Sequence, residues 1–145
     1  MATTNTTVSI TSNDLTDDNL SINVSKQCYK NGTTLGLDQT TGLNRVYLTA
    51  TTNVDIVNTV GTTHAGKGAK LYIANLSTTD TEYIIVTKGG NVIVRLYAGD
   101  WMCMPHERED THVSDIEIEP SVATGMFVEY MMIMDGITLT TAADS

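Results

Sequence analysis

The chain has 145 residues, 41% of them hydrophobic and 17% charged, which predicts one globular domain with its own core. It contains 25 Thr, 12 Val and 11 Ile, whose branched side chains fit a pleated sheet better than a helix. This composition argues against a helical bundle, a coiled coil or a Rossmann-type enzyme. The formal charge of −9 argues against a nucleic-acid partner, because an acidic surface repels the phosphate backbone.

The first residues are polar, and we expect them to form an arm. Residues 1–12, rich in Thr, Asn and Ser, predict an extended arm ahead of a single sandwich domain over residues 13–145. Ordering a backbone costs about 1–2 kcal/mol per residue, and the arm has too little apolar surface to offset that cost. We therefore expect Met1 to Thr11 to pack on another chain rather than on its own core. The arm lacks the basic and apolar regions of a signal peptide.

Apolar and polar residues alternate along most of the chain, and this alternation predicts short strands. Paired glycines between two β-branched runs predict a central hairpin that turns at residues 88–91, and Asn31-Gly32 predicts another tight turn. Pro105 and Pro120 are expected to end the strands that precede them. The expected strands cover residues 20–28, 45–50, 53–60, 69–75, 81–87, 92–97, 101–104, 115–119 and 126–134, with a short edge strand at 137–140.

Short strands separated by regular turns predict an all-β fold, namely an antiparallel β-sandwich or jelly-roll-like single domain. Strands joined by tight turns favour antiparallel pairing, whereas a parallel sheet needs long crossover connections. The most apolar stretch, residues 126–134, is interrupted by Glu129 and is too short to cross a bilayer, so we expect no membrane partner.

Two stretches resemble ligand-binding loops, and for both we favour a plainer interpretation. Residues 61–68 nearly match a phosphate-binding loop, but Gly68 stands where a Ser or Thr would bind magnesium. A strand is also expected next, where that loop requires a helix. Residues 14–18 contain three aspartates but lack the Gly and the distal Glu of a calcium loop, so they predict a solvated turn.

A third stretch, residues 106–112, gathers His106, His112 and three carboxylates, a set that could hold a divalent cation or perform acid–base chemistry. An exposed acidic loop is the interpretation that we favour. Cys28 and Cys103 make no metal-ligand spacing and are expected to be small buried side chains. No nucleophile stands in a recognisable catalytic pattern, so the sequence predicts a protein that is not an enzyme and that needs no cofactor, metal or nucleotide.

From Leu71 onward the chain resembles small β-rich structural proteins of tailed-phage virions. The matching features begin with the run from Leu71 to Thr79 and the Gly-Gly hairpin. They continue with Arg95-Leu-Tyr-Ala-Gly-Asp-Trp101, which leads to Pro105, and with residues 120–124 and 128–130. This pattern of turns and aromatic residues covers about half of the chain.

Virion proteins of this group and size are commonly capsid decoration, or cement, proteins. The resemblance implies a homo-oligomer, most commonly a trimer, that binds the major capsid protein on the outside of the capsid and stabilises the shell against the pressure of packaged DNA. A tail, head–tail or fibre component is the alternative within virions. A carbohydrate-binding or adhesion sandwich is the alternative outside them, with six tyrosines available: Tyr29, Tyr47, Tyr72, Tyr83, Tyr97 and Tyr130. We expect contacts with neighbouring subunits from Thr3, Thr4, Asn5, Thr6, Thr7, Arg95 and Trp101.

Overall fold

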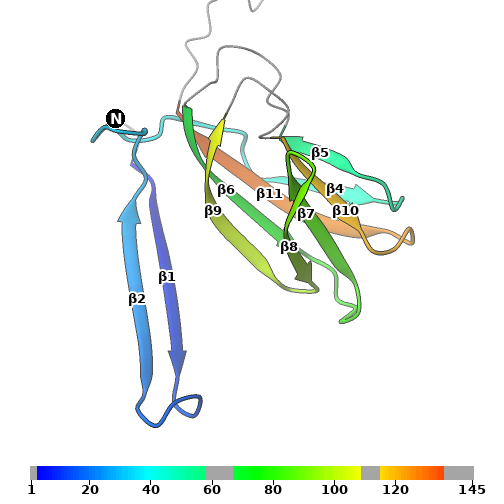
Figure 1. The fold of residues 1–145 in the computed structure, drawn as a ribbon, viewed down its shortest axis with the longest axis horizontal. Coiled ribbons are helices and arrows are strands. Elements are labelled where there is room, and N and C mark those ends of the chain that lie inside the picture. Colours follow the sequence, from blue (N-terminus) through cyan, green and yellow to red (C-terminus); the bar gives the residue numbers. More distant parts are fainter. Residues whose placement is uncertain (1–2, 58–66, 109–114, 136–145) are drawn as a thin grey trace, which may run out of the picture.

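The computed structural model describes residues 3–57, 67–108 and 115–135, and within these ranges its regular elements are all strands (Figure 1). The antiparallel all-β sandwich that the sequence predicts is confirmed. The strands are β1 (Asn5–Ser12), β2 (Leu20–Gln27), β3 (Gln39–Thr40), β4 (Asn44–Leu48), β5 (Val54–Val57), β6 (Lys67–Asn75), β7 (Tyr83–Lys88), β8 (Asn91–Tyr97), β9 (Trp101–Arg108), β10 (Ile116–Pro120) and β11 (Met126–Met134).

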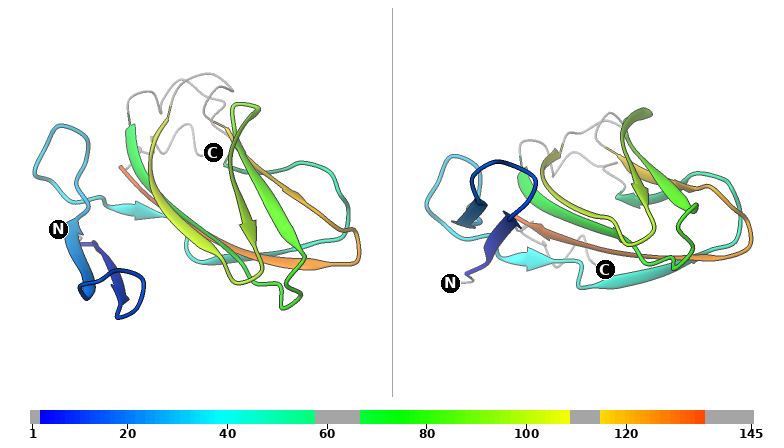
Figure 2. Two further views of the ribbon diagram at one scale, coloured as in Figure 1. Left: turned by 60° about the horizontal axis from the view of Figure 1, so that its bottom comes forward. Right: turned by 90° about the horizontal axis from the view of Figure 1, so that it is seen from below.

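Two sheets form the layers of the sandwich (Figure 2). One sheet has four strands in the order β5-β10-β7-β8. The other has five strands, with β11, β6 and β9 side by side and the short strands β3 and β4 both paired with the free side of β11. Every strand pair is antiparallel. Among the described residues, β8 pairs only with β7 and β9 pairs only with β6, so β8 and β9 are edge strands.

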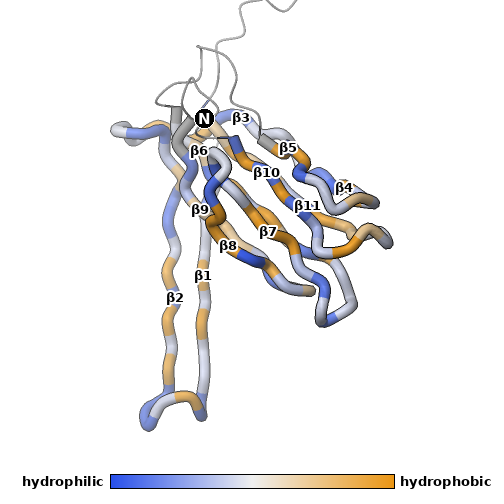
Figure 3. The backbone as a smooth tube through the Cα atoms, turned by 45° about the vertical axis from the view of Figure 1, so that its right-hand side comes forward, coloured by the Kyte–Doolittle hydropathy of each residue, from blue (hydrophilic) through white to orange (hydrophobic). Residues whose placement is uncertain are grey.

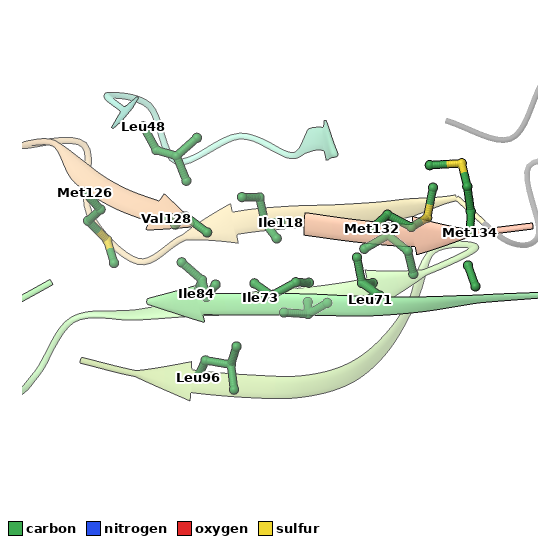
Figure 4. Close-up of a cluster of buried hydrophobic side chains, with 13 residues drawn as sticks. Leu48, Leu71, Ile73, Ile84, Leu96, Ile118, Met126, Val128, Met132 and Met134 are labelled. Carbon is green, nitrogen blue, oxygen red and sulfur yellow. The ribbon is translucent and has the colours of Figure 1, made fainter. Parts of the chain in front are cut away.

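The core lies between the two sheets and receives side chains from both (Figure 4). In β10, Ile116 and Ile118 are fully buried, while Glu117 and Glu119 alternate with them on the outer face. The same alternation places Leu71 and other apolar residues of the five-stranded sheet against them. Burial of each large apolar side chain contributes roughly 1.5–3 kcal/mol. The binary pattern that predicts the strands is therefore also the pattern that builds the core.

The central hairpin turns where the sequence predicts. β7 and β8 pair antiparallel, and Gly89 and Gly90 join them with φ angles of 56° and 80°. Two successive positive φ values are what the tight turn of a two-residue hairpin requires, and glycine adopts them without steric cost. Gly32 likewise has a φ of 70° in the expected Asn31-Gly32 turn.

Pro105 does not end its strand, contrary to the sequence prediction. β9 continues from Trp101 to Arg108 with Pro105 inside it, opposite Lys70 of β6. Because β9 pairs with β6 alone among the described residues, the position lacking an N–H can face the open edge of the sheet. Pro120 does end β10, as predicted. The expected edge strand at residues 137–140 lies outside the described residues.

The N-terminal residues form a strand of a hairpin rather than an extended arm. β1 pairs along its whole length with β2, from Asn5 opposite Gln27 to Ser12 opposite Leu20. The two strands project together as a ribbon beside the sandwich (Figure 1). The projecting unit therefore includes the strand that the sequence assigns to the sandwich domain.

Candidate interaction surface

The β1–β2 hairpin has one apolar face. Val8 lies opposite Val24, and Ile10 lies opposite Ile22, so all four side chains point to the same side of the ribbon. Hydrophobic and hydrophilic positions alternate along both strands of the ribbon (Figure 3). Their exposed fractions are 37%, 57%, 48% and 41%, respectively. We call these four residues the hairpin apolar face. A lone two-stranded hairpin is marginally stable in water, so a face of this kind gains from being covered.

The opposite face of the hairpin is polar and exposed. Thr7 and Ser25 share a hydroxyl hydrogen bond of 3.1 Å, and Ser9 lies opposite Asn23. At the tip, residues 13–19 are exposed, as a solvated turn requires. Leu15, 74% exposed, stands among the tip residues. The ribbon is thus amphipathic, with one face suited to water and the other to a protein surface.

The hairpin root is linked to the sandwich by Lys30, which pairs with Asp135, and by the Asp38 N–H, which donates to the Met134 carbonyl at 3.3 Å. Cys28 and Leu37 are 2% and 1% exposed, and the Leu37 N–H donates to the Cys28 carbonyl at 3.2 Å. The Cys28 N–H donates to the Thr4 carbonyl at 2.8 Å, and the Thr6 hydroxyl lies 3.0 Å from the Cys28 sulfur. Of the candidate arm residues, Thr4 and Thr6 are partly buried, while the others are exposed: Thr3, Asn5 and Thr7.

A second exposed apolar group lies on the outer face of the five-stranded sheet. Tyr47 of β4 and Phe127 of β11 stack with ring centroids 4.6 Å apart, and they are 53% and 50% exposed. Trp101 of β9 is 56% exposed at the other edge of this face. We call these three residues the aromatic face. Large aromatic side chains exposed to this degree are typical of interaction sites.

A charged group lies between the members of the aromatic face. Glu129, only 9% exposed, accepts from Arg45 Nε at 2.9 Å and from the Tyr72 hydroxyl at 3.4 Å. Burial raises the pKa of Tyr72, and the neighbouring Glu129 carboxylate acts in the same direction. The strand register places Glu129 opposite Ala74, which in turn lies opposite Trp101. The face therefore has apolar edges and a bound ion pair at its centre.

Arg95, the other candidate contact residue, lies on the opposite sheet. Its guanidinium carbon is 4.3 Å from the centroid of the Tyr83 ring, and Tyr83 stacks on Tyr97 with centroids 5.2 Å apart. Its neighbours in β8 point into the core, so Arg95 faces outward from the four-stranded sheet. The structure therefore separates Arg95 from Trp101, which the sequence groups in one interface.

The residues that carry the virion resemblance form a structural corner. Asn75, 1% exposed, donates through Nδ2 to the Leu96 carbonyl at 3.1 Å and accepts from the Ser77 N–H at 2.9 Å. Its backbone N–H donates to the Asp100 carbonyl at 2.9 Å, and the Gly99 N–H donates to the Asn75 carbonyl at 3.0 Å. The buried Asn75 therefore connects the turn that begins at Ser77 with the turn at Gly99 and Asp100.

Two expectations about chemistry need correction. His106 lies within β9 and is 2% exposed, so it is not part of an exposed loop; residues 109–114 lie outside the described residues, as do 61–66. Cys28 is buried as predicted, but Cys103 is exposed, because it occupies an outward position on an edge strand.

In the described ranges, no three His, Cys, Asp or Glu side chains gather to hold a metal ion. Among the same residues, no helix is long and apolar enough to cross a membrane.

Comparison with known proteins assigns no relative to the chain: no family model matches it, and no curated protein sequence does. The interaction surface must therefore be interpreted from its own geometry. That geometry consists of an amphipathic projecting hairpin, an aromatic face on the outer side of one sheet, and a corner built from the resemblance motif. The sequence pattern of Val8, Ile10, Ile22 and Val24 contains the signal for the hairpin apolar face, since two alternating runs flank a polar turn.

Proposed function

We propose that the protein is a non-enzymatic structural protein of a phage virion, a capsid decoration protein that acts by contact. In this proposal it forms a homo-oligomer, a trimer in the commonest arrangement, and binds the major capsid protein on the capsid exterior. Decoration stabilises a shell because area buried across neighbouring capsid subunits must be exposed again before they separate. No step of this function requires a cofactor or a reactive side chain.

The observation that carries the proposal is the projecting β1–β2 hairpin. Its four apolar side chains are all more than one-third exposed, and the core of the sandwich includes none of them. A protein that works alone gains nothing from such a ribbon, whereas a protein that docks on a neighbour gains a directed apolar surface. The hairpin therefore supports a function based on assembly.

The order of the strands also supports a role in a viral shell. From β4 to β11 the chain passes from one sheet to the other at every connection except the β7–β8 hairpin. This winding is compatible with a jelly roll, the two-sheet fold that recurs in viral capsid domains and in lectins. The acidic charge of −9 agrees with a position away from the packaged DNA.

The decisive experiment compares particles that lack the protein with complete particles during heating. We expect depleted heads to assemble but to burst at a lower temperature, and added protein to restore them. Two double variants make the test specific: Ile10→Lys with Ile22→Lys on the apolar face, and Ser9→Lys with Asn23→Lys on the polar face. Each pair lies directly opposite across the hairpin, so both variants add the same charges at the same depth.

The apolar-face variant should fail to restore the heads, while the polar-face variant should restore them. If depleted heads are as robust as complete ones while adsorption to host cells fails, the protein is a tail component and the decoration proposal is wrong. If both hairpin variants restore the heads equally, the hairpin is not the contact element.

The aromatic face favours a second candidate, a carbohydrate-binding sandwich. Exposed rings on a flat sheet can stack against sugar rings, and Tyr47, Phe127 and Trp101 offer such rings. Glycan-array binding that is lost in Trp101→Ala but kept in the Ile10→Lys, Ile22→Lys variant would support this function over decoration.

A further inference from the structure

A cleft of about 430 Å³ lies between the hairpin root and the outer face of β6 and β9. One wall comes from residues 26–33, which lead out of β2, and the other from Lys70, Cys103 and Pro105 of the sheet. A volume of a few hundred Å³ is typical of sites that bind small organic molecules. The cleft includes none of the aromatic face, and it lies at the root end of the hairpin, where Thr6 and Lys26 pair on the same side of the ribbon as the hairpin apolar face.

The cleft concentrates positive charge in an acidic protein. The chain has only five lysines, and three of them line this cleft: Lys26, Lys30 and Lys70. Like charges that surround one cavity repel each other, and the 17 acidic residues of the chain could have paired them elsewhere. An anion that enters the cleft would relieve this repulsion.

The three lysines are not equivalent. Lys30 Nζ lies 2.7 Å from Asp38 Oδ2 and 3.3 Å from Asp135 Oδ1, and its hydrogen bond to Asp38 raises the pKa of Lys30. Across the described ranges, neither Lys26 nor Lys70 has a carboxylate within ion-pair distance. Lys30 therefore holds the root together, and the ammonium groups of Lys26 and Lys70 are available to a ligand.

The remaining wall is largely apolar. Tyr29 and Pro105 line the cleft together with the lysines. The Tyr29 hydroxyl already donates to Gln27 Oε1 at 3.2 Å, so the ring rather than the hydroxyl is offered to a ligand. An inorganic ion would leave this apolar surface unused, whereas an organic anion would contact both parts of the cleft.

We propose that this cleft binds a small organic anion, an apolar body carrying one carboxylate or phosphate group. The anionic group lies between Lys26 and Lys70, and the apolar body packs against Tyr29 and Pro105. The proposal rests on the cleft alone and is independent of the decoration function. It predicts that charge and apolar body are both required for binding.

Cys103 provides a reporter inside the cleft. Its thiol lines the wall beside Lys70, and its exposure lets a neutral reagent such as N-ethylmaleimide reach it. The rate of alkylation of Cys103 in the full chain, followed by peptide mass spectrometry, is measured with benzoate, phenyl phosphate, benzamide, benzylammonium and inorganic phosphate. Benzoate and phenyl phosphate should slow alkylation in a saturable way. Benzamide, benzylammonium and inorganic phosphate at equal concentration should not.

Matched variants test the lysines. Lys26→Gln and Lys70→Gln should each weaken binding of benzoate about tenfold, as expected for a lost charge-assisted hydrogen bond. Lys88→Gln, beside the β7–β8 turn, makes the same charge change outside the cleft and should leave binding unchanged. Protection is calculated within each variant, so a changed intrinsic reactivity of Cys103 does not enter. Equal protection by benzoate and benzamide, or unchanged binding in both lysine variants that melt normally, would overturn the proposal.

Discussion

At the scale of single residues, Asn75 shows how a polar side chain becomes a necessary part of this core. Its amide joins the Leu96 carbonyl to the Ser77 N–H, and its backbone joins the turn at Asp100. Each of these groups would lose hydrogen bonds to water on burial, so each needs the partner that Asn75 supplies. The residues from which we infer a resemblance to virion proteins therefore include a corner of the fold.

Asn75→Ala should lower the free energy of unfolding by about 2–3 kcal/mol, because buried partners are left without hydrogen bonds. Urea unfolding followed by tryptophan fluorescence measures the change. Asn23→Ala, on the exposed polar face of the hairpin, serves as the control and should change stability by less than about 0.5 kcal/mol. Equal effects of the two variants would contradict the role of the corner.

The two cysteines should differ in reactivity. Burial raises the pKa of the Cys103 thiol, Cys28 acts in the same direction, and Lys70 opposes them. Although Cys103 is exposed as a residue, its sulfur lies at the wall of the cleft, so its thiolate forms only at higher pH than in a short peptide. Native alkylation should label Cys103 alone, with a pH midpoint above that of a peptide thiol, and Cys28 should react only after unfolding. Labelling of Cys28 in the native protein at a similar rate would show that the root opens.

At the scale of elements, the hairpin and the sandwich make separate contributions. The core cluster draws on β4 to β11 and contains no side chain from β1 or β2. The residues that follow the hairpin connect it to the sandwich, where Lys30 pairs with Asp135 and the Asp38 N–H donates to the Met134 carbonyl. An element with so few buried contacts can change without unfolding the rest of the protein.

Replacing residues 9–23 with an Asn-Gly turn would shorten the hairpin and keep its root. We expect the free energy of unfolding of the sandwich to change by less than about 1 kcal/mol, since no core contact is removed. Oligomer formation, measured by light scattering after size-exclusion chromatography, should be lost. A shortened protein that keeps the native oligomer would place the contact elsewhere, for example on the aromatic face.

At the scale of the whole molecule, charge opposes assembly while apolar surface favours it. Copies of the chain each carry a formal charge of −9 and repel one another across a shared interface. The hairpin apolar face has no such dependence on salt, because burial of apolar surface does not rely on charge. The balance between the two should therefore depend on ionic strength.

Oligomers should become tighter as salt increases. Screening shortens the Debye length from about 30 Å at 0.01 M to about 8 Å at 0.15 M ionic strength, which reduces repulsion between acidic copies. Sedimentation velocity across this range, with the Ile10→Lys, Ile22→Lys variant as a control for the interface, measures the effect. Assembly that weakens with salt would instead point to ion pairs between subunits.

The sequence alone determined the class of the fold and most of the strands, because alternation and turn residues act over short distances, but it missed β1 and β3. Ile116 and Ile118 alternate with Glu117 and Glu119, and this alternation predicts which side of the strand faces the core. Gly89-Gly90 predicts a turn from these two residues alone. Residues 126–134 were expected to form one strand and do so.

Only the tertiary structure decided which surfaces are free. The sequence predicts a polar arm at residues 5–12 because β1 contributes only two of the four residues of the hairpin apolar face. The other two come from β2, which pairs with β1 only in the folded protein. Pro105 is tolerated inside β9, and Cys103 is exposed, because β9 is an edge strand. The edge position is a property of the whole sheet and cannot be inferred from the residues of β9. Lys26 and Lys70, 44 positions apart in the sequence, line one cleft because the fold places the segment that leaves β2 beside the outer face of β6. Pairing between distant segments sets burial, and burial decides whether a side chain serves the core or a partner.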